Sequence, residues 1–82
     1  MAKPIFTPRH EQLRRLLTQA RKASGLTQVQ LSSKLSRSQS FVSKYEKGER
    51  RLDMIEVLEV TEVLGIDPIE LLRQIMPMPA DE

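Results

Sequence analysis

The sequence has 82 residues, no cysteine, one histidine and a formal net charge of +2, which allows one small domain. The lack of cysteine excludes disulfides and thiolate zinc sites, and a single histidine argues against a histidine metal site. No apolar run approaches the length of a membrane span, and the first residues lack the apolar core of a signal peptide. We therefore expect a cytoplasmic protein with no membrane contact, no metal and no cofactor.

The sequence predicts an all-α fold, and its first half contains signals for three helices. Thr7 followed by Pro8 is typical of a helix start, and Gly25 predicts that this helix ends near residue 24. Thr27 is the predicted cap of a second helix, whose apolar stripe is Val29, Leu31 and Leu35. A third helix is predicted to begin at the cap Ser38 and to end at Gly48.

Two more helices are predicted in the second half. Asp53 followed by Glu56 is a capping box for the fourth helix, which Gly65 ends. Asp67 followed by Pro68 starts a fifth helix. The sequence thus predicts a compact five-helix bundle that forms a single domain over residues 1–76, with a C-terminal tail at 77–82.

The charge is divided unequally along the chain. Residues 1–52 hold 12 of the 13 lysines and arginines against three acids, a net charge of +9. Residues 53–82 hold Arg73 alone against eight acids, a net charge of −7. Such asymmetry is consistent with a basic half that meets a polyanion, although lysines and arginines also commonly solvate helix surfaces.

The second and third predicted helices, joined by a short turn, have the pattern of a helix-turn-helix over about residues 27–46. Ser32 is a small residue where the helices would cross, and Leu31, Leu35, Val42 and Tyr45 supply a core. The remaining face of the third helix is polar and carries no acid before its far end. Its mid-length hydrogen-bonding side chains suit contact with base edges in the major groove.

The stretch from Leu13 to about Leu72 resembles the Cro/CI-type helix-turn-helix regulators, also called the XRE family. The matching residues are Arg21, then Gly25-Leu26-Thr27-Gln28, Leu31, and the third-helix pattern Ser38-Gln39-Ser40-x-Val42-Ser43-x-Tyr45-Glu46-x-Gly48. The resemblance implies a lambda-repressor-like five-helix domain that binds double-stranded DNA.

The resemblance also implies roles for individual residues. The predicted base contacts are Gln39, Ser40, Ser43 and Lys44. The predicted phosphate contacts are Gln28, Ser38, Lys47, Arg50 and Arg51, and Arg37 is added to them as a cation just before the third helix. Arg21 and Glu46 match a family pair that forms an internal salt bridge. Gln28 also matches a residue that braces the first recognition residue.

The turn between the two helices departs from the family pattern of a glycine followed by an apolar residue. Here it is Ser36 followed by Arg37. If residue 36 has a left-handed backbone, serine there costs about 1 kcal/mol relative to glycine. Arg37 replaces an apolar plug, and the sequence leaves open a phosphate contact, a base contact or a solvated side chain.

The acidic half is rich in apolar residues. We expect the fourth helix to turn Ile55, Leu58 and Leu64 towards the core. The remaining apolar side chains could complete a well-filled core that leaves a few valines exposed, but we predict that they form a two-fold dimer interface. Its predicted residues are Val60, Val63, Ile69, Leu72, Ile75 and Met76.

These features predict a homodimeric DNA-binding transcriptional regulator, a repressor in the simplest mechanism, that binds an inverted repeat. Phage-type repressors, restriction–modification controllers and antitoxins all fit. Activation through RNA polymerase stays open. The alternative is a protein-interaction module, such as an antitoxin whose C-terminal helices bind a toxin-like partner. No candidate nucleophile has an identifiable base, so we do not expect an enzyme.

Overall fold

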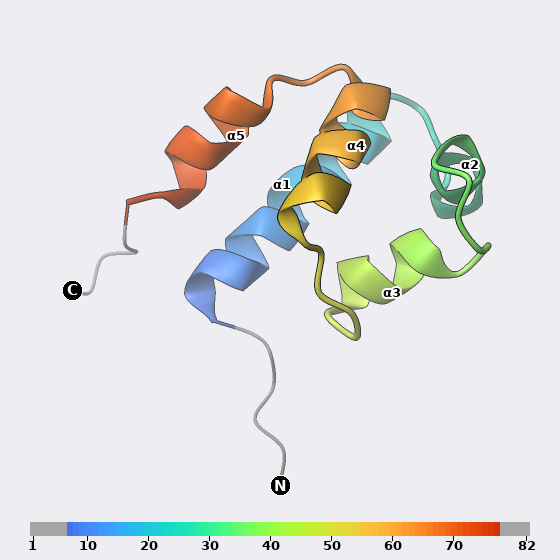
Figure 1. The fold of residues 1–82 in the computed structure, drawn as a ribbon, viewed down its shortest axis with the longest axis horizontal. Helices are drawn as coiled ribbons and strands as arrows, with labels where there is room; N and C mark the ends of the chain where they lie inside the picture. Colours follow the sequence, from blue (N-terminus) through green and yellow to red (C-terminus); the bar gives the residue numbers. More distant parts are fainter. Residues whose placement is uncertain (1–6, 78–82) are drawn as a thin grey trace, which may run out of the picture.

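The computed structural model describes residues 7–77, and these residues contain five helices and no strand (Figure 1). The helices are α1 (Pro8–Ala23), α2 (Gln28–Lys34), α3 (Phe41–Lys47), α4 (Met54–Leu64) and α5 (Pro68–Ile75). The all-α prediction is therefore confirmed. No helix in this part of the chain is long and apolar enough to cross a membrane. Of the predicted tail, residues 78–82 lie outside the described residues.

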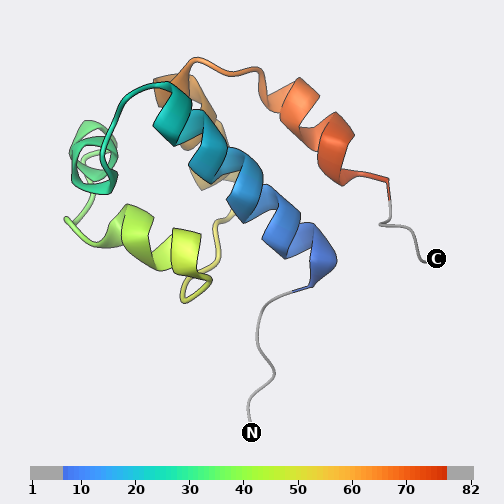
Figure 2. The same cartoon turned by 180° about the vertical axis from the view of Figure 1, so that it is seen from behind.

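Helix α1 is the central element of the bundle. Figure 2 shows it running between α5 on one side and the α2–α3 pair on the other. Its predicted start is confirmed, since the Thr7 side chain accepts the His10 N–H at 3.1 Å. Its predicted end is also confirmed, with Ser24 as C-cap and Gly25 at a φ of 77°. The bundle thus places α5 and the α2–α3 pair on opposite sides of α1.

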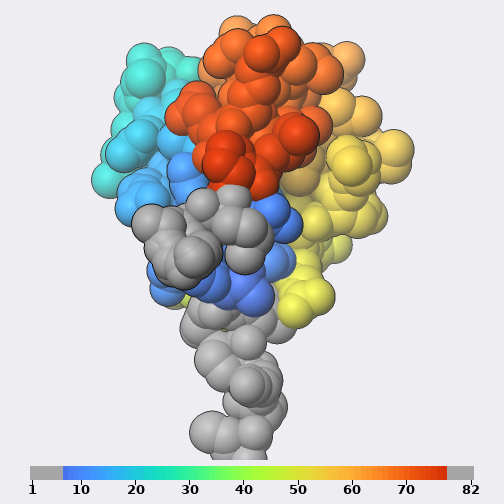
Figure 3. All heavy atoms as spheres, turned by 90° about the vertical axis from the view of Figure 1, so that its left-hand side faces the viewer, coloured from blue at the N-terminus to red at the C-terminus, as the bar shows by residue number. Residues whose placement is uncertain are grey.

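Side chains of α1 also fix the far end of the chain. Arg9 donates to the carbonyl of Met76 at 2.7 Å, and Gln12 donates to that of Gln74 at 3.0 Å. These carbonyls belong to the last turn of α5, where a helix has no internal donors for them. The predicted cap Asp67 accepts the Ile69 N–H at the other end of α5. Figure 3 shows α5 in front of α1 and α4.

Capping boxes start both α2 and α4. At α4 the box is the predicted one, in which Asp53 accepts the Glu56 N–H at 2.7 Å and Glu56 accepts the Asp53 N–H at 3.0 Å. At α2 the Thr27 hydroxyl accepts the Gln30 N–H, and Gln30 accepts the Thr27 N–H in return. Each box satisfies two backbone donors that the helix leaves unpaired.

The start of α3 differs from its prediction. Ser38 is not the N-cap, because α3 begins at Phe41 and its N-cap is Ser40, whose side chain makes no capping hydrogen bond. Ser38 instead closes a turn, in which its carbonyl accepts the Phe41 N–H at 3.0 Å. The predicted end is confirmed, since Gly48 is a left-handed C-cap with a φ of 83°.

One core joins all five helices. Its fully buried apolar side chains include Leu17 of α1, Leu31 of α2, Val42 and Tyr45 of α3, and Val60 of α4. Leu71 of α5 is also buried, and half-buried residues such as Leu13 and Leu35 pack around the cluster. The predicted stripe of α2 is wrong at Val29, which is 48% exposed.

Helix α4 turns a different face to the core from the predicted one. Val57, Val60 and Leu64 are buried, whereas Ile55 and Leu58 are 61% and 41% exposed. The prediction is therefore right for Leu64 and wrong for Ile55 and Leu58. The physical reason is that α4 is apolar on most sides, so helical spacing alone does not single out one face.

Candidate nucleic-acid interface

Helices α2 and α3 and their connection form a helix-turn-helix at one side of the bundle. The turn depends on a left-handed residue, since Ser36 has a φ of 58° and is the only non-glycine residue with positive φ among those described. The Arg37 N–H then donates to the Ser32 carbonyl at 2.9 Å and closes the end of α2. The left-handed backbone that the sequence left conditional for residue 36 is present at Ser36.

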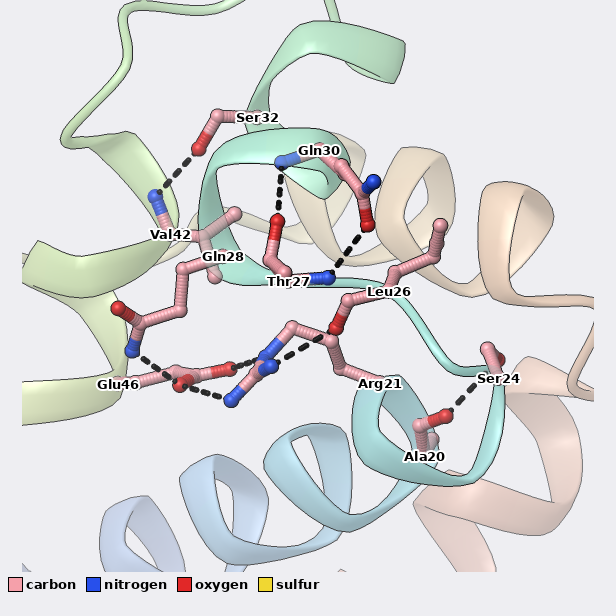
Figure 4. A network of polar contacts seen from close by, with 10 residues as sticks. All are labelled: Ala20, Arg21, Ser24, Leu26, Thr27, Gln28, Gln30, Ser32, Val42 and Glu46. Atoms are coloured by element: carbon pink, nitrogen blue, oxygen red, sulfur yellow. Dashed lines mark hydrogen bonds and ion pairs between the residues drawn. The ribbon is translucent and has the colours of Figure 1, made fainter.

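Ser32 fixes the crossing of the two helices. It is completely buried in α2, and its hydroxyl accepts the Val42 N–H at 3.1 Å (Figure 4). Val42 is the second residue of α3, so its N–H has no partner within that helix. Ser32 therefore supplies, from the neighbouring helix, a capping bond that Ser40 does not make.

The predicted base contacts lie together at and just before α3. Gln39 and Ser40 are exposed at its N-terminal end, and Lys44 is exposed one turn further on. Ser43 is half-buried. In a helix-turn-helix the N-terminal residues of the second helix approach base edges. The structure thus leaves the side chains that suit this contact open to solvent.

A buried polar network joins α1, α2 and α3. The Arg21 guanidinium donates to both carboxylate oxygens of Glu46, at 2.8 and 3.1 Å, and to the carbonyl of Leu26 at 2.9 Å (Figure 4). The expected ion pair of Arg21 and Glu46 is therefore present, and both side chains are at most one-tenth exposed. Such two-point pairs fix geometry as well as contributing energy.

Gln28 belongs to the same network. Its side-chain amide donates to Glu46 Oε1 at 2.8 Å, so the first residue of α2 is bound to α3. The resemblance implied that Gln28 braces the first recognition residue, whereas the hydrogen bond that the structure shows for its side chain runs to Glu46. The network thus holds Gln28 at the start of α2.

The other predicted phosphate contacts separate into two groups. Ser38, Lys47 and Arg51 are exposed around α3, as a phosphate contact requires. Arg37 and Arg50 are instead engaged inside the protein. Arg37 donates to Glu56 Oε2 at 2.8 Å, and Arg50 donates to both Glu56 oxygens at 2.9 Å.

The two arginines also cover Phe41. Their guanidinium carbons lie 4.6 Å (Arg37) and 4.9 Å (Arg50) from the centre of the Phe41 ring, within the range of a cation–π contact. Hydrogen bonds from Arg50, from the Asp53 backbone and from Arg37 lower the pKa of the Glu56 carboxyl to about 2 against the opposing effect of burial. Arg37 is therefore bound to Glu56 and packed on Phe41.

Sequence reasoning missed this cluster of Arg37, Phe41, Arg50 and Glu56. The only local signal was Glu56 as the capping-box acid. Nothing in the spacing of residues 37, 50 and 56 indicates that they meet, because their contact depends on how α3 and α4 pack.

The predicted dimer residues are unequally exposed. Val60 was wrongly predicted, because it is completely buried inside its own chain. Val63 and Ile75 are half-buried against the core, and Leu72 is also half-buried. Ile69 and Met76 are 55% and 64% exposed. The apolar residues exposed on α4 are Met54, Ile55 and Leu58.

The geometry agrees with comparisons with known proteins. Residues 12–74 match the model of a family described as a helix-turn-helix domain. An XRE-family like protein from Pseudomonas syringae pv. tomato str. DC3000 has a similar structure, with a TM-score of 0.78 and 47% sequence identity over 83% of each chain. No curated protein matches the chain. The match runs from α1 to α5, and the chain therefore belongs to the helix-turn-helix domain family and is an XRE-type protein.

Proposed function

We propose that this protein is a homodimeric, sequence-specific regulator of transcription that binds an inverted repeat in double-stranded DNA. Membership of an XRE-type helix-turn-helix family indicates a DNA-binding regulator. The observation that carries the proposal is the exposed, acid-free group of Gln39, Ser40 and Lys44 at the start of α3. Glutamine suits adenine and lysine suits guanine in the major groove.

Charge supports the same orientation on DNA. Lys44, Lys47 and Arg51 are exposed on and just after α3, where phosphate contacts would set affinity and register. The acidic residues Glu59, Glu62 and Glu70 lie on α4 and α5, and α5 is on the opposite side of α1 from the α2–α3 pair. In this orientation the basic half faces the polyanion and α5 faces away from it.

The exposed apolar residues support a dimer. Met54, Ile55 and Leu58 of α4, Ile69 of α5 and Met76, the residue that follows α5, are 41–64% exposed. Figure 3 shows α5 and the start of α4 on one side of the molecule. A second copy related by a two-fold axis would cover these side chains, and two helix-turn-helix units would then contact half-sites one turn of DNA apart, about 34–36 Å. Binding across a promoter would repress by excluding RNA polymerase.

The test is selection of binding sites from a random duplex pool at two salt concentrations. We expect an inverted repeat with half-site centres about 10 base pairs apart. Gln39→Ala should weaken binding to that site by roughly 1–3 kcal/mol and relax the choice at one base pair. Retention of DNA with no enriched sequence at either salt concentration would contradict the proposal.

A second candidate function is a protein-interaction module, such as an antitoxin. The same exposed apolar residues of α4 and α5 support it, since they suit another protein as well as a second copy. Replacing Gln39, Ser40 and Lys44 together by alanine separates the two. If the protein is a DNA-binding regulator, this triple variant should lose the biological phenotype. If the protein is an interaction module, the phenotype should be unchanged.

A further inference from the structure

The segment that precedes α3 carries two of the predicted base contacts, Gln39 and Ser40, and has little to fix it locally. Ser40 is the N-cap but makes no side-chain capping bond. The backbone bonds of the segment run to α3, where the Phe41 N–H donates to the Ser38 carbonyl at 3.0 Å and the Lys44 N–H donates to the Ser40 carbonyl at 2.9 Å. Ser38, Gln39 and Ser40 are all exposed. Their path must therefore be fixed by the residues on either side, Arg37 and Phe41.

Arg37 binds the Glu56 carboxylate directly, and Phe41 packs against the two guanidiniums that this carboxylate holds. Glu56, on α4, accepts a hydrogen bond from Arg37 at 2.8 Å and two from Arg50 at 2.9 Å. Both guanidiniums lie within 5 Å of the centre of the Phe41 ring. Glu56 thus connects the residue before the segment, the residue after it and the loop that follows α3.

The cluster is built to hold its geometry. The Glu56 side chain is only 8% exposed. Removing a partner from a buried carboxylate strongly destabilises the folded protein. The Glu56 carboxylate also accepts the backbone N–H of residue 53 at 3.0 Å, a bond that holds it against the start of α4 and does not need the Asp53 side chain. Charge-assisted bonds to two guanidiniums are among the strongest that side chains form.

We infer that Glu56 is a positioning residue for base recognition, which fixes the path of Ser38 to Ser40 through Arg37, Arg50 and Phe41. It thereby determines sequence discrimination without touching DNA. The inference rests on the proposed DNA-binding function. It also assigns Arg37 and Arg50 to positioning in place of phosphate contact.

The first test compares Glu56→Gln with Asp53→Ala in the full chain, below the melting temperature of both. Asp53→Ala weakens the same end of α4 but keeps the Glu56 carboxylate and both arginines. The measurement is the ratio of dissociation constants for the selected site and a scrambled duplex. We expect Glu56→Gln to lower this discrimination at least tenfold without weakening binding to the scrambled duplex, since two guanidiniums lose their internal partner. Asp53→Ala should preserve the ratio.

Three results would contradict the inference in distinguishable ways. If wild-type protein selects no site, the proposed function itself fails. If it selects a site and Glu56→Gln discriminates as well as Asp53→Ala, only the role of Glu56 fails. Equal loss of binding to both duplexes in Glu56→Gln would show a purely structural role.

The second test needs no DNA and uses Arg37→Ala as a milder variant, because the Arg37 side chain is one-third exposed. Amide hydrogen exchange of free protein is expected to become at least tenfold faster at Phe41 and Val42 in Arg37→Ala, relative to the Lys44 amide. The salt dependence of DNA binding by Arg37→Ala should match that of wild type. A salt slope reduced by about one would instead identify Arg37 as a phosphate contact and overturn the inference.

Discussion

The Ser32 hydroxyl of α2 accepts the backbone N–H of Val42 in α3 at 3.1 Å, at a position where neither residue is exposed. This bond joins the two helices of the helix-turn-helix at their crossing. Because Ser40 leaves the start of α3 without a side-chain cap, the orientation of α3 depends on a residue of its neighbour.

Removing this bond should destabilise the fold. We expect Ser32→Ala to lower the free energy of unfolding by about 1–3 kcal/mol, because the Val42 donor would be left buried and unpaired. Urea denaturation measures the change. Ser33→Ala is the matched control, since Ser33 is the next residue in α2 and is exposed, and it should change stability by less than about 0.5 kcal/mol. Equal effects of the two variants would contradict the capping role.

The left-handed turn residue should be improved by glycine. Ser36 has a φ of 58°, which costs a non-glycine residue about 1 kcal/mol or more. Ser36→Gly should therefore raise the melting temperature and leave DNA affinity near that of wild type. The reverse change, Gly65→Ser, should lower stability through the backbone alone. Gly65 has a φ of 72°, and an added Cβ would meet nothing within 4 Å. A lower melting temperature for Ser36→Gly than for wild type would contradict backbone strain at Ser36.

Acid should unfold the protein partly through Glu56. Its pKa is about 2 in the folded protein against an ordinary value of 4.5, so protons bind preferentially to the unfolded chain. The stabilisation is complete above pH 4.5 and is lost as the pH falls towards 2. Urea denaturation at several pH values measures this effect. The free energy of unfolding should fall less steeply over this pH range in Glu56→Gln than in wild type. Glu62→Gln, at an exposed position of α4, should follow wild type.

Phosphate contacts should be found at the exposed cations around α3. Arg51→Ala should weaken binding to all DNA sequences alike and reduce the slope of log K against log salt by about one. Fluorescence anisotropy titrations at four salt concentrations measure both quantities. A changed base preference in Arg51→Ala would rule out a purely phosphate role.

The dimer should depend on the exposed face of α4. We expect the melting temperature of wild type to rise with protein concentration from nanomolar to micromolar. Ile55→Glu should abolish this dependence. Ile55 is 61% exposed in the single chain, and a dimer would bury the charge of the glutamate that replaces it. Val29→Glu makes the same change at an apolar residue that is 48% exposed on α2, and should retain the dependence. A concentration-independent melting curve for wild type would contradict an obligate dimer.

Local signals in the sequence determined where most helices begin and end. The caps at Thr7, Thr27, Asp53 and Asp67 and the glycines after the helices are short-range features, since each depends on bonds within a few residues. The departure from the family glycine also marked Ser36 as the residue where a left-handed backbone would be strained. The ion pair of Arg21 and Glu46 could be predicted from the family resemblance, because both residues match positions of the family's sequence pattern.

Tertiary structure decided what depends on distant neighbours. Helix α4 is apolar on most sides, so only its packing selects Val57, Val60 and Leu64 over Ile55 and Leu58 for the core. The start of α3 has no side-chain cap of its own, and the Val42 N–H is bound instead by Ser32 of another helix. Arg37 and Arg50 are both cations near α3 in the sequence, and only the folded chain brings them to Glu56, because burial and ion pairing are set by contacts between residues far apart along the chain.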